Sequence, residues 1–192
     1  MIDSTTTRPL RQTPVSSYRP TPMNWRERGI GIARIIFGLV WVVAAILQWL
    51  PQFQNTFVGQ VTAARGGQPG FIQAWISFWA NLVSVNPLLF ARMLATTEAM
   101  IAVFLILGLL SNLASLVGIF LSLGIWAIPE GFGGPYIPGF TTDIGTAFPY
   151  AILFLVLLCL SAGRYYGLDH WLTPRLGRLG FLASGSLRRR GK

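Results

Sequence analysis

Four apolar stretches, each close to the length of a bilayer crossing, dominate this chain of 192 residues. They occupy residues 30–50, 88–110, 113–128 and 144–162, and the third is the shortest. An α-helix rises about 1.5 Å per residue, so about 20 apolar residues cross a hydrocarbon layer of about 30 Å. Charged residues make up only 11% of the chain, whereas a soluble domain averages about 25%. The sequence therefore predicts an all-α integral membrane protein, a four-helix bundle.

The formal net charge of +9 comes mainly from the two ends of the chain. Of the 15 basic residues, five precede the first apolar stretch and seven follow the fourth, whereas the long predicted loops contain only Arg65. The positive-inside rule then places both termini in the cytoplasm, as an even number of spans requires. We expect a multi-pass protein of the cell inner (plasma) membrane whose tails contact anionic lipid headgroups. Nucleic-acid binding is not expected.

Composition divides the chain into three parts. Residues 1–24 are rich in Thr, Pro, Ser and Arg, too polar to bury a core, and are expected to form a disordered basic cytoplasmic tail. Residues 25–172 form the four-span membrane domain. Residues 173–192 form a second basic cytoplasmic tail, and the alternation of Leu and Arg at 168–179 predicts a short amphipathic segment on the inner membrane surface.

The segment between the first and second spans, residues 51–86, is too long and too apolar for a simple loop. Phe71, Trp75 and Trp79 recur at helical spacing, and a Gly-rich run at 65–70 divides the segment. The pattern predicts two short amphipathic helices that lie in the interface on the outer side. They form either a structural cap on the bundle or a lid over a lipid-accessible pocket, with Trp75 and Trp79 as candidate quinone contacts.

A second outer connection, rich in Gly and Pro, precedes the fourth span. Asp143 lies just before that span, where a carboxylate is favoured by the helix dipole, so it is expected to cap the helix. Its position also makes Asp143 a candidate for the outer pocket. Glu130, earlier in the same loop, is interpreted as a solvated charge.

Three ionisable residues, Arg34, Arg92 and Glu98, lie inside the apolar stretches, where charges are costly. Glu98 follows Ala95 by about one helical turn and Ala91 by about two, so it shares their face and should point into the bundle. A carboxyl group there either carries a proton or pairs with a base, and Arg34 and Arg92 are the candidate partners. Two interpretations stay open: a structural ion pair that holds helix register, or a functional group for quinone binding or proton transfer.

The chain has no motif of a known catalytic chemistry. Cys159 and His170 are single residues of their kinds, so no cluster has zinc or iron–sulfur spacing and a second histidine for haem is lacking. Walker A and Rossmann glycine patterns are also absent. The sequence therefore predicts no metal and no haem, and it leaves the catalytic residues unknown. Any prosthetic group for redox chemistry is expected in another polypeptide.

Several segments, in their order and spacing, are similar to those of a known family. They are RIIFGLVWVVAAILQWL with Arg34 and Gly38, Glu98 ahead of LILGLL, the Gly/Pro-rich outer loop leading into TTDIGTAFPYAILFLVLL, and the exit SAGRYYGLDHWL. Over about residues 25–172 the chain resembles the DoxX/DoxD family of small four-span membrane proteins. The last two segments most resemble the DoxD branch, the small subunit of thiosulfate:quinone oxidoreductase.

The resemblance implies a membrane subunit that meets the quinone pool and works with another protein subunit, with thiosulfate as the electron donor. The alternative, from a different class, is a non-catalytic accessory subunit that anchors a larger respiratory or photosynthetic membrane complex. A lipid-facing apolar groove filled by a partner's helix, with no quinone-sized cavity, would distinguish the alternative. A small-solute transporter is disfavoured because the sequence shows no inverted repeats or paired broken helices.

Overall fold

A computed structural model describes residues 23–139 and 141–184, and every regular element in this part of the chain is helical. This confirms the all-α prediction. Two helices, α1 (Trp25–Trp49) and α4 (Pro87–Leu107), are long and apolar enough to cross a membrane by length and composition. Two others, α5 (Ser111–Ala127) and α6 (Ala147–Cys159), are apolar but shorter. The 13 residues of α6 rise only about 20 Å.

Local sequence signals set the ends of the two long helices. At the start of α1 the Glu27 carboxylate accepts a hydrogen bond of 2.8 Å from the Asn24 backbone N–H, as in a capping box. At the start of α4 the Asn86 side chain accepts from the Leu89 backbone N–H at 3.1 Å, and proline occupies the first helical position. Gly108 ends α4 in the left-handed conformation, at a φ of 60°.

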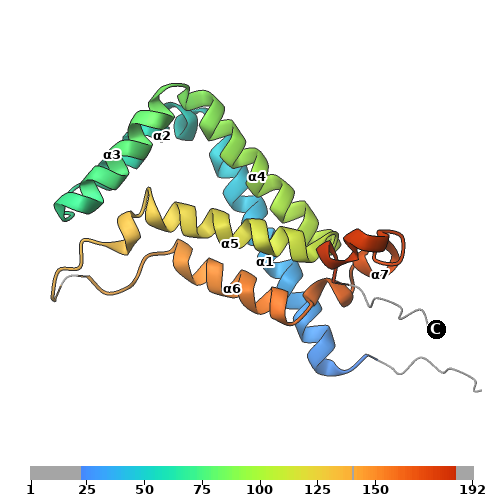
Figure 1. The fold of residues 1–192 in the computed structure, drawn as a ribbon. Coiled ribbons are helices and arrows are strands. Elements are labelled where there is room, and N and C mark those ends of the chain that lie inside the picture. Colours follow the sequence, from blue (N-terminus) through green and yellow to red (C-terminus); the bar gives the residue numbers. More distant parts are fainter. Residues whose placement is uncertain (1–22, 140, 185–192) are drawn as a thin grey trace, which may run out of the picture.

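The helices pack as pairs, α1 along α4 and α5 along α6. Figure 1 shows the two pairs converging at the end near α7, here called the basal end, and diverging toward the opposite, distal end. A hairpin of α2 (Pro51–Ala63) and α3 (Gly70–Ser84) extends across the distal opening. These are the two short helices expected between the first and second apolar stretches, and the Gly-rich run separates them.

The turn of this hairpin is fastened to the distal end of α5. The Gln68 side chain donates a hydrogen bond of 3.0 Å to the carbonyl of Gly131, in the short 3-10 helix η1 (Gly131–Gly133). The Trp75 indole N–H donates to the Ala127 carbonyl, also at 3.0 Å. These two bonds hold the hairpin as the third side of a triangle whose other sides are the helix pairs (Figure 1).

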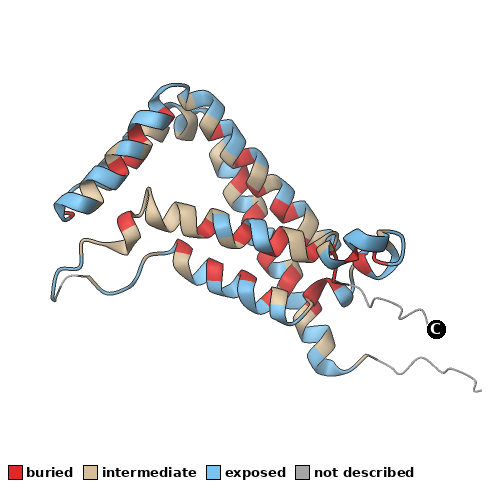
Figure 2. Ribbon diagram, in the orientation of Figure 1, coloured by how far each residue is buried: buried red, intermediate tan, exposed pale blue. Residues whose placement is uncertain are grey.

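The core lies where the two pairs converge, and the outward faces of the helices are largely exposed (Figure 2). An aromatic cluster joins the pairs: the Phe154 ring of α6 lies 4.8 Å from the Phe37 ring and 5.3 Å from the Trp41 ring of α1, centroid to centroid. Ile101 and Leu105 of α4 complete this cluster. A smaller core of Val61, Ile76 and Ala80 lies within the α2–α3 hairpin.

The segment after α6 folds back onto the basal end. It comprises η2 (Ala162–Arg164), α7 (Asp169–Leu172) and η3 (Gly177–Leu182). The Asn112 side chain at the start of α5 donates a hydrogen bond of 2.9 Å to the Phe181 carbonyl. Residues 173–184, assigned from sequence to the C-terminal tail, therefore pack against the helices. Residues 1–22, which hold most of the predicted N-terminal tail, and residues 185–192, the last part of the predicted C-terminal tail, lie outside the described residues.

Candidate functional site

The face of α4 that packs on α1 combines small residues with one carboxylic acid. Ala91 and Ala95 have no exposed surface, and Glu98 is 2% exposed. Small side chains let two helix backbones approach closely where surrounding lipid provides no hydrophobic drive for association. The prediction that Glu98 shares the alanine face and points inward is confirmed.

Gln48, near the end of α1, is the hydrogen-bond partner of Glu98. Its side-chain N–H donates to the Glu98 Oε1 at 2.7 Å. Arg34, one of the two candidate partners, does not pair with Glu98, because Arg34 precedes Gln48 on the same helix by about four turns, or about 21 Å. Arg92, the other candidate partner, is exposed on α4. A neutral amide, and not a cation, therefore faces the buried carboxyl group.

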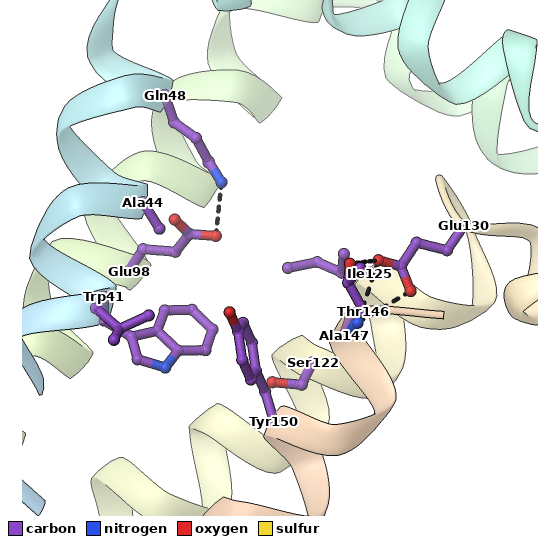
Figure 3. Close-up of a pocket in the computed structure, with 11 residues that line it drawn as sticks. Trp41, Ala44, Gln48, Glu98, Ser122, Ile125, Glu130, Thr146, Ala147 and Tyr150 are labelled. Carbon is purple, nitrogen blue, oxygen red and sulfur yellow. Dashed lines mark hydrogen bonds between the residues drawn. The ribbon is translucent and has the colours of Figure 1, made fainter. Parts of the chain in front are cut away.

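A cavity of about 170 Å³ lies beside this pair, between α1, α4, α5 and α6 (Figure 3). Its walls are Val40, Trp41, Ala44, Gln48, Glu98, Ser122, Ile125, Glu130, Thr146, Ala147 and Tyr150. The Tyr150 side chain extends from α6 with its hydroxyl directed toward Glu98 (Figure 3). The lining is mainly apolar around these polar groups, and at about 30 Å³ per water a space of this size holds several waters.

Four side chains in the wall have buried polar atoms that lack a hydrogen-bond partner within the described residues. The atoms are Trp41 Nε1, Gln48 Oε1, Glu98 Oε2 and Ser122 Oγ. Buried polar groups are nearly always paired, so these four atoms are exceptions in the packing around the cavity. The atoms themselves have almost no accessible surface. The buried Glu98–Gln48 pair and the Tyr150 hydroxyl are therefore the polar features of the wall that concern a ligand.

The far wall of the cavity is fixed by Glu130. Its carboxylate accepts from the Ala147 backbone N–H at 3.0 and 3.1 Å and from the Thr146 hydroxyl, and so caps the start of α6. The expected roles of two acidic residues are thus reversed. Asp143 accepts only from Gly145 within its own turn and lies outside the cavity, while Glu130, interpreted as a solvated charge, caps the helix.

We expect Glu130→Ala to lower the free energy of unfolding by about 1 kcal/mol, because the first N–H groups of α6 lose their acceptor and the helix dipole loses its anion. Equilibrium unfolding in mixed detergent micelles measures the change. Asp143→Ala is the matched control and should leave the unfolding free energy almost unaltered. A larger loss for the Asp143 variant would contradict this assignment of the cap.

An apolar groove of about 310 Å³ adjoins the polar cavity on the side of the α2–α3 hairpin. It is lined by Phe57, Val61, Trp79, Val83, Phe90, Met93, Leu94, Thr97, Phe120, Leu121, Gly124, Ile125, Ile128 and Pro129. Of the two tryptophans predicted near a pocket, Trp79 lines this groove. Trp75 does not: it contacts the Trp79 ring at 5.7 Å and bonds to the Ala127 carbonyl.

A second buried polar cluster, separate from the cavity, occupies the basal end. Asp169 has no exposed surface, and its Oδ2 accepts from the backbone N–H of Ser111 at 3.0 Å and of Ser184 at 2.9 Å. Arg34, equally buried, donates to the Tyr166 carbonyl at 3.1 Å and interacts electrostatically with Asp169. This cluster ties α1, the start of α5 and the C-terminal segment together.

Sequence reasoning missed Gln48, Tyr150 and Asp169. Gln48 is an uncharged polar residue within the first apolar stretch, and that interruption was the available signal. Asp169 lies in the segment SAGRYYGLDHWL, where its acidic charge among neighbouring arginines was the corresponding signal. Tyr150 carried none, because a tyrosine near a span end is also typical of the membrane interface.

Within residues 23–139 and 141–184, no three His, Cys, Asp or Glu side chains come together as a metal site would require. Comparison with models of protein families, with curated proteins and with solved structures finds no match to this chain. The arguments for function therefore come from the cavity, the groove and the sequence pattern.

Proposed function

We propose that this chain is a four-span membrane subunit of a quinone-linked oxidoreductase, and that the polar cavity at Glu98 binds the quinone ring. The observation that carries the proposal is one cavity of about 170 Å³ whose wall contains the buried Glu98–Gln48 pair and Tyr150. Ligand sites in proteins are mostly apolar pockets with a few convergent polar groups, and this cavity fits that description. The resemblance to the DoxX/DoxD family adds thiosulfate as the electron donor.

The membrane placement follows from the apolar outer faces of the helices. Exposed side chains on α1 include Ile32, Ile36, Val43 and Ile46, and those on α6 include Leu155. We propose that α5 and α6 also cross, since a short span is accommodated by local thinning of the bilayer and by flanking residues. The basic residues near both ends support the proposal that the basal end faces the cytoplasm, in a cell with an inner (plasma) membrane.

The cavity residues suit both redox forms of a quinone. Quinone carbonyls accept hydrogen bonds and quinol hydroxyls donate them, and reduction of one to the other takes up two electrons and two protons. In the cavity wall the Tyr150 hydroxyl can donate a hydrogen bond, and the Glu98 carboxyl can accept one or, when protonated, donate one. Glu98 is also an acid–base group in the cavity wall, which it shares with Tyr150, so we propose that it exchanges a proton with the ring.

The experiment is quinone binding to the full chain in lipid nanodiscs. The probe is a dimethoxy-methylbenzoquinone ring, and binding is measured by equilibrium dialysis. Glu98→Gln and Gln48→Leu should each weaken binding about tenfold, the effect of losing a hydrogen bond to an ionisable group. The matched control is Asp143→Asn, an equivalent acid-to-amide change outside the cavity, which should bind as the unmodified chain does. Unaltered binding in both cavity variants would refute the proposed site.

A second candidate function is the non-catalytic accessory subunit that anchors a larger respiratory or photosynthetic complex. The observation that favours it is the apolar groove beside the hairpin, which a protein partner could fill. Purification in mild detergent, followed by mass spectrometry of bound chains and lipids, distinguishes the two functions. Bound quinone with thiosulfate-dependent quinone reduction by the purified complex supports the oxidoreductase. A co-purifying complex that carries no quinone supports the anchor.

A further inference from the structure

We infer that the polar cavity and the apolar groove are two parts of one site, which binds the quinone ring at Glu98 and its isoprenoid tail between α3, α4 and α5. This inference rests on the proposed function and extends it to the part of the ligand that distinguishes a membrane quinone from a soluble one.

The cavity and the groove are neighbours. Ile125 of α5 lines both spaces. On α4, Thr97 lies in the groove wall and the next residue, Glu98, lies in the cavity wall. The ring and the tail of one ligand would therefore meet at Ile125.

The groove is also less polar than the cavity. Its wall presents mainly apolar side chains, and the hydroxyl of Thr97 is already bonded to the Met93 carbonyl of its own helix at 2.8 Å. The Trp79 indole N–H is the other polar group of a residue in the groove wall. The only carboxyl groups of the two spaces, those of Glu98 and Glu130, belong to residues of the cavity wall. A polar head joined to a hydrocarbon chain matches this difference, whereas a uniformly polar solute leaves the groove unfilled.

The size of the groove suits a hydrocarbon tail. At about 310 Å³, it lies within the range of about 300 to 1,000 Å³ found for small-molecule sites.

Gly124 provides the test. It lines the groove, and a Cβ atom built on it meets no other atom within 4 Å, so a larger side chain there extends into open space. The two probes are the dimethoxy-methylbenzoquinone ring alone and the same ring carrying a decyl chain. Lipid already solvates the decyl chain of the free probe, so Gly124→Leu is expected to act by excluding that chain sterically from the groove. It should weaken binding of the decyl probe about tenfold or more and leave the bare ring unaffected.

Two further variants complete the design. Thr97→Leu narrows the groove from α4 and should also weaken binding of the decyl probe while leaving binding of the bare ring unaffected. It keeps the test valid if Gly124→Leu disturbs the fold. Gly59→Leu is the matched control, because Gly59 lies on α2 outside the groove and is equally free of contacts. Equal binding of the decyl probe to all three variants and the unmodified chain overturns the inference. So does loss of a co-purifying polypeptide from Gly124→Leu with quinone binding intact, which would assign the groove to a protein partner.

The two proposals fail in different ways. If the bare ring does not bind, or binds equally well after Glu98→Gln, the proposed function fails. If the bare ring binds in a Glu98-dependent way and the groove variants leave the decyl probe unaffected, only the shared site fails.

Discussion

Replacing Asp169 by alanine is expected to lower the free energy of unfolding by about 3 to 5 kcal/mol, the cost of removing one partner from a buried charged pair. The side chain has no exposed surface, and its Oδ2 accepts from two backbone N–H groups, those of Ser111 and Ser184. Alanine leaves both N–H groups without an acceptor and leaves the buried Arg34 without a nearby anion. Each unmet buried group alone costs about 1 to 3 kcal/mol.

A milder substitution separates the charge from the hydrogen bonds. In Asp169→Asn the amide oxygen can still accept from both backbone N–H groups, but the negative charge facing Arg34 is gone. We expect Asp169→Asn to lower the free energy of unfolding by about 2 kcal/mol in the unmodified chain. When Arg34 is methionine the same change should cost well under 1 kcal/mol, because no buried positive charge is then left without a nearby negative one.

Equilibrium unfolding in mixed detergent micelles, followed by tryptophan fluorescence, measures all four members of this cycle. The control is Asp143→Asn, since Asp143 is exposed and bonds only within its own turn. If Asp169→Asn lowers the free energy of unfolding equally in the chain with Arg34 and in the chain with methionine at that position, the two charges do not interact. The cluster would then be a backbone cap for α5 alone.

The sequence predicted those features that depend on residues close together in the chain. The Asn86–Pro87 pair marks the start of α4, and the Gly-rich run separates α2 from α3. The inward direction of Glu98 followed from its spacing to Ala91 and Ala95, because helical periodicity fixes which residues share a face. In each case the signal lies within about two turns of the residue it describes.

The contacts of the site could not be predicted in the same way. Periodicity gives the face on which Glu98 lies but not the depth at which α1 passes it, so Arg34 and Gln48 were not distinguishable as partners. The geometry resolved this by placing Gln48 beside Glu98 and Arg34 beside the C-terminal segment. Glu98 was expected to face a cation, whereas its hydrogen bond comes from an amide, and Arg34 donates to a backbone carbonyl.

The exchange of roles between Glu130 and Asp143 has the same origin. A capping residue is usually sought next to its helix, and Asp143 was the nearest acid. The cap of α6 instead comes from the far side of the loop, where the chain leaving α5 turns back toward Ala147. Contacts closed by a long loop depend on the loop path, which the Gly and Pro content of 129–142 leaves undetermined.

Replacing Gly118 by leucine is expected to lower the free energy of unfolding by about 3 kcal/mol, or to prevent accumulation of the protein in the membrane. Gly118 lies on α5 directly against the Phe154 ring of α6, and any Cβ atom there overlaps that ring. Phe154 has no exposed surface and is held in turn by Phe37 and Trp41. The ring cannot move aside without disturbing the aromatic cluster that joins the two helix pairs.

The compensating substitution tests whether this clash is the cause. Phe154→Ala alone should cost about 3 to 5 kcal/mol, because it opens a cavity in the core. Combined with Gly118→Leu it should cost less than the sum of the two single changes, since the new leucine occupies the space that the ring leaves. Purely additive losses would mean that α5 and α6 do not pack through this contact.

Gly124→Leu is the matched comparison, the same substitution on the same helix about two turns away. Because a Cβ atom on Gly124 meets no neighbour within 4 Å, the change should leave stability unaltered or raise it by up to about 1 kcal/mol through helix propensity. One face of α5 is thus required for the fold and the other is free to line a groove. If Gly124→Leu stays folded while Gly118→Leu does not, loss of the decyl probe from Gly124→Leu reports on the groove itself.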